Sequence, residues 1–151
     1  MHFLLNFKFL EMSQILDKSC RCLSSSKEVL EAGMCAPSGH LTYYGMYDFF
    51  RYIMCHYIGV GYEEQNKVFS GAGSHDKLTK KLMADIKTKL KALGEDRETD
   101  IMDYKEKAKS IKRLRGIADY RPQCVSAEEW KENYNSTINL INDIKPLYCI
   151  A

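Results

Sequence analysis

The stretch from Leu41 to Ile58, LTYYGMYDFFRYIMCHYI, is the part of this chain that most strongly specifies its fold. Its apolar and aromatic side chains recur every three or four residues, which is the spacing of a helix and not of a strand. One stripe consists of Tyr43, Tyr47, Phe50, Met54 and Tyr57, and it is widened by Tyr44, Phe49 and Ile53. A helix that is apolar on most sides lies at the centre of a bundle or at a contact between subunits. We therefore expect these tyrosines to pack in a core and not to stack on nucleic-acid bases.

The segments on either side of this helix also show helical periodicity. A first amphipathic helix is expected to stop near Gly33, which suits the left-handed conformation after a helix end. Gly59-Val60-Gly61 is expected to end the second helix, and the chain from there to Gly73 is interpreted as a loop.

Three further helices are predicted in the second half of the chain. Ser74 is expected to cap the third helix, Asp100 the fourth, and Ser126 the fifth, where Glu129 completes a capping box. Their expected inward faces are Leu78, Leu82, Ile86, Leu90 and Leu93, then Ile101, Tyr104, Ala108, Ile111 and Leu114, then Trp130, Tyr134, Ile138, Ile141 and Tyr148. The sequence predicts one domain over residues 1–151, an all-α, mainly up-and-down bundle of about five helices.

Positive charge is concentrated in the middle of the chain. The net charge is only +2, but residues 74–121 contain 14 Lys and Arg against 9 Asp and Glu. Within them, Lys105, Lys109 and Lys112 form a stripe on the fourth helix. Such a stripe is either an attractive surface for phosphate or an ordinary solvated face.

The six cysteines do not follow a metal-binding pattern, since no C-x-x-C pair occurs. The first residues lack the core and cleavage site of a signal peptide, and no apolar run is long enough to span a membrane. We therefore expect a cytoplasmic protein with reduced, partly buried thiols, and neither a metal nor another cofactor.

The stretch Lys112–Pro122, KRLRGIADYRP, is the strongest candidate for a functional site. Arg115 and Asp119 are spaced to pair on one helix, although a carboxylate near a helix C-terminus is disfavoured by the helix dipole. The helix should end before Pro122. The cluster is therefore either a structural salt bridge or a site whose charges serve a ligand.

A tyrosine-rich helix, a Ser74-His75 helix start and a basic helix ending in R-x-x-x-D-Y resemble, in that order, the HEPN family of higher eukaryote and prokaryote nucleotide-binding domains. In active HEPN ribonucleases an arginine is followed after four to six residues by a histidine, usually across a dimer. Here Arg115 matches the arginine, while Tyr120 stands in the place of the histidine. The resemblance implies catalytic positions at Arg115, Asp119 and Tyr120 and ligand contacts from His75, Lys112, Arg113 and Arg121.

A second R-x4-H pattern, Arg51 to His56, lies inside the second helix. At about 100° per residue the two side chains point roughly 140° apart, so they do not converge on one phosphate within one helix.

The resemblance and the excess of apolar surface on the second helix together imply a homodimer, and the resemblance further implies a protein that binds nucleotide or RNA. Its candidate partner protein is a minimal nucleotidyltransferase, in a toxin–antitoxin module. Because tyrosine is a poor general base at neutral pH, binding is favoured over cleavage. Two alternatives stay open: an interaction subunit without catalysis that holds a partner enzyme, and a metal-independent ribonuclease that uses a displaced histidine. The sequence alone does not decide whether the chain is an enzyme.

Overall fold

The computed structural model describes the backbone of residues 2–94, 98–120 and 125–151, and the side chains of residues 14–94, 98–119 and 125–151. Within these ranges the elements are α1 (His2–Glu31), α2 (Cys35–His56), α3 (Tyr62–Val68), α4 (Ser74–Ala92), α5 (Glu98–Tyr120), α6 (Ala127–Ile144) and a short 3-10 helix, η1 (Lys145–Tyr148). The described residues form only helices and their connections, which confirms the all-α class. The expected count of about five helices is one too few.

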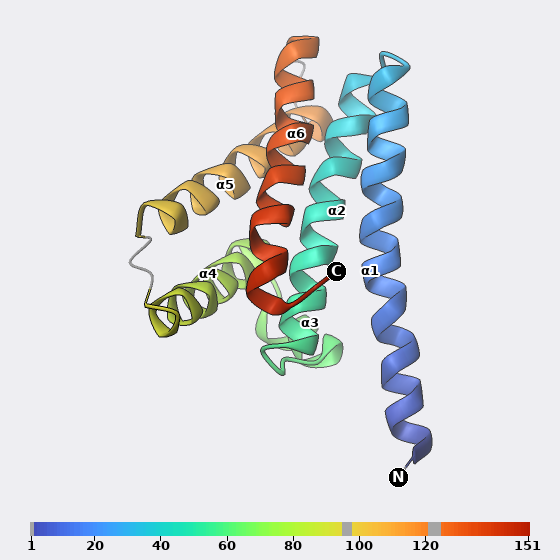
Figure 1. Cartoon of the computed structure of the whole chain (residues 1–151). Coiled ribbons are helices and arrows are strands. Elements are labelled where there is room, and N and C mark those ends of the chain that lie inside the picture. The colour runs from blue at the N-terminus through green and yellow to red at the C-terminus, as the bar shows by residue number, and fades with distance from the viewer. Residues whose placement is uncertain (1, 95–97, 121–124) are drawn as a thin grey trace.

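Helix α2 is the centre of the molecule. In Figure 1, α1, α2 and α6 lie side by side, while α4 and α5 lean away from them, so only part of the bundle is up-and-down. Helix α2 contacts all five other α helices. Phe49, Phe50, Ile53 and Met54 are at most 1% exposed. Of the two positions that the sequence allows for this helix, the structure therefore shows the centre of the bundle.

The contact between α1 and α2 is close because small residues face each other there. The Ser19 hydroxyl donates to the Gly45 carbonyl at 2.6 Å, and a Cβ on Gly45 would overlap the Leu23 side chain. Further along, the Ser26 hydroxyl lies 2.6 Å from that of Thr42. Each of these buried hydroxyl groups has a hydrogen-bond partner across the contact, so the close packing leaves none of them unpaired.

Helix α3 is the element that the sequence analysis missed, because the glycines around it favoured a loop. Gly61 precedes the helix in an extended conformation, and Glu63 and Glu64 lie in its first turn, where the helix dipole favours them. Gln65 fixes the helix in place, since its buried side-chain amide donates to the carbonyls of Val60 (2.8 Å) and Arg51 (3.1 Å).

The start and the end of α4 correct two expectations. Gly73, at a φ of 73°, precedes the helix, and its carbonyl accepts the Lys77 amide at 3.0 Å. Ser74 is therefore the first helical residue and not the cap. Leu93 follows the helix end at Ala92 and is 65% exposed, so it does not continue the inward face.

The inward face of α5 follows the sequence prediction, whereas in α6 Trp130 and Ile141 are buried as expected but Tyr134 and Ile138 are only partly buried. Helix α5 begins at Glu98, which places Asp100 in its first turn and not at its cap. The Ser126 hydroxyl accepts the Glu129 amide at 3.1 Å, which confirms the cap of α6. Tyr148 is buried, but it belongs to η1 and donates to Asp85 at 2.7 Å. The expected inward residues of α5 are all buried: Ile101, Tyr104, Ala108, Ile111 and Leu114.

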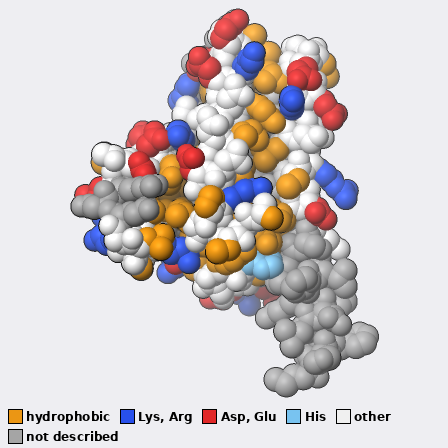
Figure 2. All heavy atoms as spheres, viewed as in Figure 1, with side chains coloured by type: hydrophobic (Ala, Val, Ile, Leu, Met, Phe, Trp, Pro, Cys, Tyr) orange, Lys and Arg blue, Asp and Glu red, His pale blue; other side chains and the backbone are white. Residues whose placement is uncertain are grey.

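The space-filling view in Figure 2 shows charged side chains of both signs spread over this face, with apolar side chains visible between the helices. No helix in the described ranges combines the length and the apolar character that a membrane crossing requires. The cysteines whose side chains are described form no disulfide with one another: Cys20, Cys22, Cys35, Cys55 and Cys149. Cys124 lies outside the described residues. Cys20 and Cys149 are exposed, contrary to the expectation of partly buried thiols.

Candidate functional site

Arg115 lies near the end of α5, where this helix passes the aromatic face of α2. Its Nε is 2.7 Å from Asp119 Oδ2, so the predicted pair one turn apart is formed. Its guanidinium carbon lies 5.7 Å from the ring centres of both Tyr43 and Tyr44, and one of its NH2 groups donates to the Tyr44 hydroxyl at 3.3 Å. Arg115 is therefore held by a carboxylate and two aromatic rings, in a geometry that fixes the direction of its planar fork.

His75, in the first turn of α4, contacts the same aromatic face. Its Nδ1 is hydrogen-bonded to the Tyr43 hydroxyl, and its ring stacks on Tyr47 at 4.0 Å. Burial lowers the pKa of His75 from its ordinary value of 6.5, and the nearby positive charges of Lys112 and Arg115 lower it further. Tyr43 thus contacts both His75 and Arg115 and connects α4 to α5.

His40 is the residue that sequence reasoning missed. Its Nδ1 lies 3.0 Å from Asp119 Oδ1 and 3.3 Å from Oδ2, and its ring lies 4.7 Å from that of Tyr44. Asp119 therefore joins His40 of α2 to Arg115 of α5. The His40 side chain is 46% exposed, so this imidazole is accessible to a ligand.

A signal for His40 was present in the sequence. His40, Tyr43, Tyr44 and Tyr47 are spaced at i, i+3, i+4 and i+7, which places them on one face of α2. Burial is the main cause that raises the pKa of Tyr43 and of Tyr47 above the ordinary value, so these two hydroxyl groups stay neutral and act as hydrogen-bond donors and acceptors. Tyr43 is 2% exposed, which agrees with the expectation that it packs in the core.

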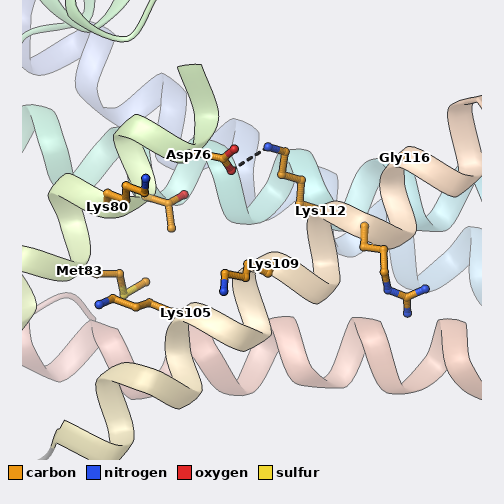
Figure 3. A pocket seen from close by; sticks show the side chains of 9 residues that line it. Asp76, Lys80, Met83, Lys105, Lys109, Lys112 and Gly116 are labelled. Atoms are coloured by element: carbon orange, nitrogen blue, oxygen red, sulfur yellow. Dashed lines mark hydrogen bonds and ion pairs between the residues drawn. The ribbon is translucent and has the colours of Figure 1, made fainter. Parts of the chain in front are cut away.

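A cleft of about 840 Å³ lies between α4 and α5. Figure 3 shows Lys105 and Lys109 of α5 beside Lys80 and Met83 of α4, with Lys112 reaching across to Asp76. The lining residues are Asp76, Thr79, Lys80 and Met83 from α4 and Lys105, Lys109, Lys112, Arg113 and Gly116 from α5. Five cationic side chains and one carboxylate therefore line this cleft, which we call the basic cleft.

The cations of the basic cleft are only partly neutralised by neighbouring carboxylates. Lys112 pairs with Asp76 at 2.7 Å, Lys109 with Glu106 at 2.7 Å, and Arg113 with Glu129 at 2.9 Å. Within the described part of the chain, Lys80 and Lys105 have no carboxylate partner. A space lined in this way attracts anions.

The basic cleft and the Arg115 cluster lie along the same helix. Lys105, Lys109, Lys112, Arg115 and Asp119 are separated by four, three, three and four residues, so they follow one side of α5. On α4, His75, which contacts the aromatic face of α2, directly precedes Asp76, which lines the basic cleft. The expected row of cations on α5 thus ends in the expected Arg115–Asp119 pair, to which the fold adds His40.

The remaining candidate residues have different outcomes. The side chain of Tyr120 and the whole of Arg121 lie outside the described residues. Arg51 faces α3, where its Nε donates to Gln65 at 3.4 Å and its guanidinium lies over the Tyr62 ring. His56 packs on the Tyr52 ring at 4.2 Å, so Arg51 and His56 contact different neighbours.

No protein-family model matches this chain, and no curated protein resembles it closely enough in sequence to indicate a relationship.

Proposed function

We propose that this protein binds a nucleotide or RNA through the phosphates of the ligand, in the basic cleft and against Arg115. The observation that carries this proposal is the excess of cations in the cleft, five against one carboxylate around about 840 Å³. Lysine and arginine side chains that neutralise phosphates, and release the counterions bound to them, dominate the affinity of proteins for nucleic acids.

The length of the cationic row favours a strand over a single nucleotide. Ten residues separate Lys105 from Arg115, which corresponds to about 15 Å along a helix. Arg115 terminates the row with a fork that Asp119 and Tyr44 hold in place, and a fixed guanidinium binds phosphate more specifically than a mobile lysine.

Binding of a fluorescent single-stranded RNA, followed by anisotropy, tests this proposal. The double variant Lys105→Ala/Lys109→Ala should bind at least about tenfold more weakly. Its plot of log affinity against log salt concentration should be shallower by about 0.7 for each phosphate that the variant no longer neutralises. The matched control is Lys27→Ala/Lys131→Ala, which removes the same charge from α1 and α6. Equally weakened binding in both double variants would mean that net charge, and not the cleft, attracts the RNA.

A second candidate function, metal-independent cleavage of RNA, is favoured by the contact of His40 with Asp119. A carboxylate that holds one ring nitrogen of a histidine orients the other for proton transfer. In such a step His40 accepts the proton of a ribose 2′-hydroxyl, whose oxygen attacks the phosphorus as the bond to the 5′-oxygen breaks. Arg115 stabilises the charge on the phosphate, and the departing 5′-oxygen takes a proton from water. The products would be a 2′,3′-cyclic phosphate and a 5′-hydroxyl.

Cleavage is tested in the presence of a chelator by the appearance of the cyclic phosphate. His40→Ala should abolish it while RNA binding is retained, and His56→Ala, at the other end of α2, serves as the control. If wild-type protein binds RNA and leaves it intact, the binding proposal stands and the cleavage proposal fails.

A further inference from the structure

His75 adjoins both parts of the proposed binding site, the basic cleft and the Arg115 cluster. The next residue, Asp76, lines the cleft and pairs with Lys112 at 2.7 Å. The Nδ1 atom of His75 is hydrogen-bonded to the Tyr43 hydroxyl, and the Tyr43 ring lies 5.7 Å from the guanidinium carbon of Arg115. His75 is only partly buried, so its imidazole can exchange protons with the solvent.

We propose that the basic cleft takes up a proton on His75 when it binds a phosphate group, so that this histidine makes binding tighter as the pH falls. The inference rests on the proposed function, because the phosphate groups that it concerns are those of the nucleotide or RNA. It adds a regulation by pH to that function.

The charges around His75 keep its imidazole neutral while the cleft is empty. Burial of the ring lowers its pKa most, and an excess of positive charge lowers the pKa further, because three cations face it against one carboxylate. The charged or titratable groups that face it are Tyr43, Tyr47 and Arg51 of α2, Asp76 of its own helix, and Lys112 and Arg115 of α5.

A bound phosphate group reverses this balance of charge. Placed against Lys112 and Arg115, it offsets two of the three cations that disfavour the imidazolium. It also competes with Asp76 for Lys112, and this leaves a carboxylate without its cation directly beside His75. Both changes favour the protonated ring, and the proton comes from the solvent.

The hydrogen bonds of His75 suit a protonated ring. The Tyr43 hydroxyl can accept a hydrogen bond from Nδ1–H as well as donate one to the neutral ring. Nε2 has no hydrogen-bond partner among the described residues. The imidazolium donates through both nitrogens, so Nε2–H is left for an oxygen of the ligand.

Titration calorimetry with oligouridylate measures the proton uptake on the full chain. This probe has no group that titrates near neutral pH, so a proton taken up on binding enters the protein. Enthalpies measured at one pH in two buffers of different ionisation enthalpy give the number of protons. Wild-type protein should take up a proton, and His75→Gln should lose most of this uptake. His56→Gln is the matched control, because burial also lowers the pKa of His56 at the far end of α2, and its uptake should equal that of wild type.

The affinity for the same probe should follow the proton. Between about pH 7.5 and 5.5 the affinity of wild type should rise by about threefold or more beyond that of His75→Gln, and one proton limits the effect to about tenfold for each pH unit. Oligouridylate that binds without proton uptake would overturn the inference and leave the proposed function intact. Uptake that persists in His75→Gln and disappears in His40→Gln would also overturn it.

A second measurement needs neither RNA nor a variant. Sulfate, which stays doubly charged over this pH range, is added to the wild-type protein, and the ring resonances of its histidines are followed by NMR as the pH is changed. Sulfate should raise the midpoint at which His75 titrates, and an unchanged midpoint would refute the inference. A raised midpoint in a protein that does not bind oligouridylate would support the coupling to anions and reject the proposed RNA ligand.

Discussion

Asp119 shows how one carboxylate organises a site. It lies near the C-terminus of α5, where the helix dipole disfavours a negative charge. Arg115 from the preceding turn and His40 from α2 offset this cost, at 2.7 Å and 3.0 Å from its two oxygens. The first partner was visible in the sequence as a spacing of four residues, but the second lies 79 residues away.

Asp76 forms an ion pair with Lys112 in the basic cleft, so it should compete with a phosphate group for this lysine. We predict that Asp76→Asn raises the affinity for single-stranded RNA by about two- to fivefold, because an exposed ion pair contributes at most about 1 kcal/mol. Anisotropy at low salt measures the change. Glu31→Gln makes the same change in net charge beside Lys27 on α1, and it should leave the affinity close to that of wild type. An equal gain in both variants would refute the competition.

His75 should make stability depend on pH. Its pKa is lowered from 6.5 in the folded state, chiefly by burial, so near and below that value the unfolded chain binds more protons than the folded chain. The contribution of neutral His75 to the free energy of unfolding is therefore fully present above about pH 7.5, and it is lost as the pH falls through 6.5. The melting temperature of the wild-type protein should fall as the pH is lowered from about 7.5 to 5.5. The melting temperature of His75→Phe should fall by less over the same range. His56, whose pKa burial also lowers, keeps some dependence in that variant. An unchanged slope in His75→Phe would contradict this prediction.

At the scale of elements, the contact of α2 with α6 depends on one glycine. A Cβ on Gly39 would overlap the six-membered ring of Trp130, and Trp130 is itself only 4% exposed. Helix α6 approaches α2 this closely because Gly39 has no side chain. The small cluster of Leu114, Ile117 and Trp130 closes the same end of the bundle.

Gly39→Ala should therefore destabilise the fold by about 1–3 kcal/mol, the usual cost of overpacking a core. Urea unfolding measures the change. Gly116→Ala is the matched control, because Gly116 also lies within a helix but has no neighbour within 4 Å of a Cβ. It should stabilise the protein by about 0.5–1 kcal/mol, since alanine loses less conformational freedom in a helix. Lower stability in both variants would mean that the indole contact is not the cause.

For the whole molecule, the structure changes the argument for a dimer. The expectation of a homodimer depended partly on the apolar surface of α2, and most of this surface is buried by the other helices of the same chain, although Tyr57 is 41% exposed. The dimer and a nucleotidyltransferase partner stay predictions from the family resemblance. Sedimentation velocity at tens of micromolar should show a dimer, and a strict monomer would leave only the single-chain site described above.

Helix α5 separates two kinds of charge across the molecule. Its side toward α4 carries the cations of the basic cleft, while a cavity on its side toward α6 is lined by glutamates.

Local sequence patterns were sufficient for the helical class, the inward faces of α4 and α5 up to Leu90 and Leu114, the cap of α6 and the cationic row on α5. These features depend on residues within about two turns of each other, which periodicity and capping rules describe. Helix α3 was missed because Gln65 stabilises it through contacts outside the helix. Three facts came from the folded molecule alone: α2 is central, His40 meets Asp119, and Tyr43 contacts both His75 and Arg115. Each of them depends on which faces of distant helices meet, and this is set by the packing of the whole chain and not by local spacing.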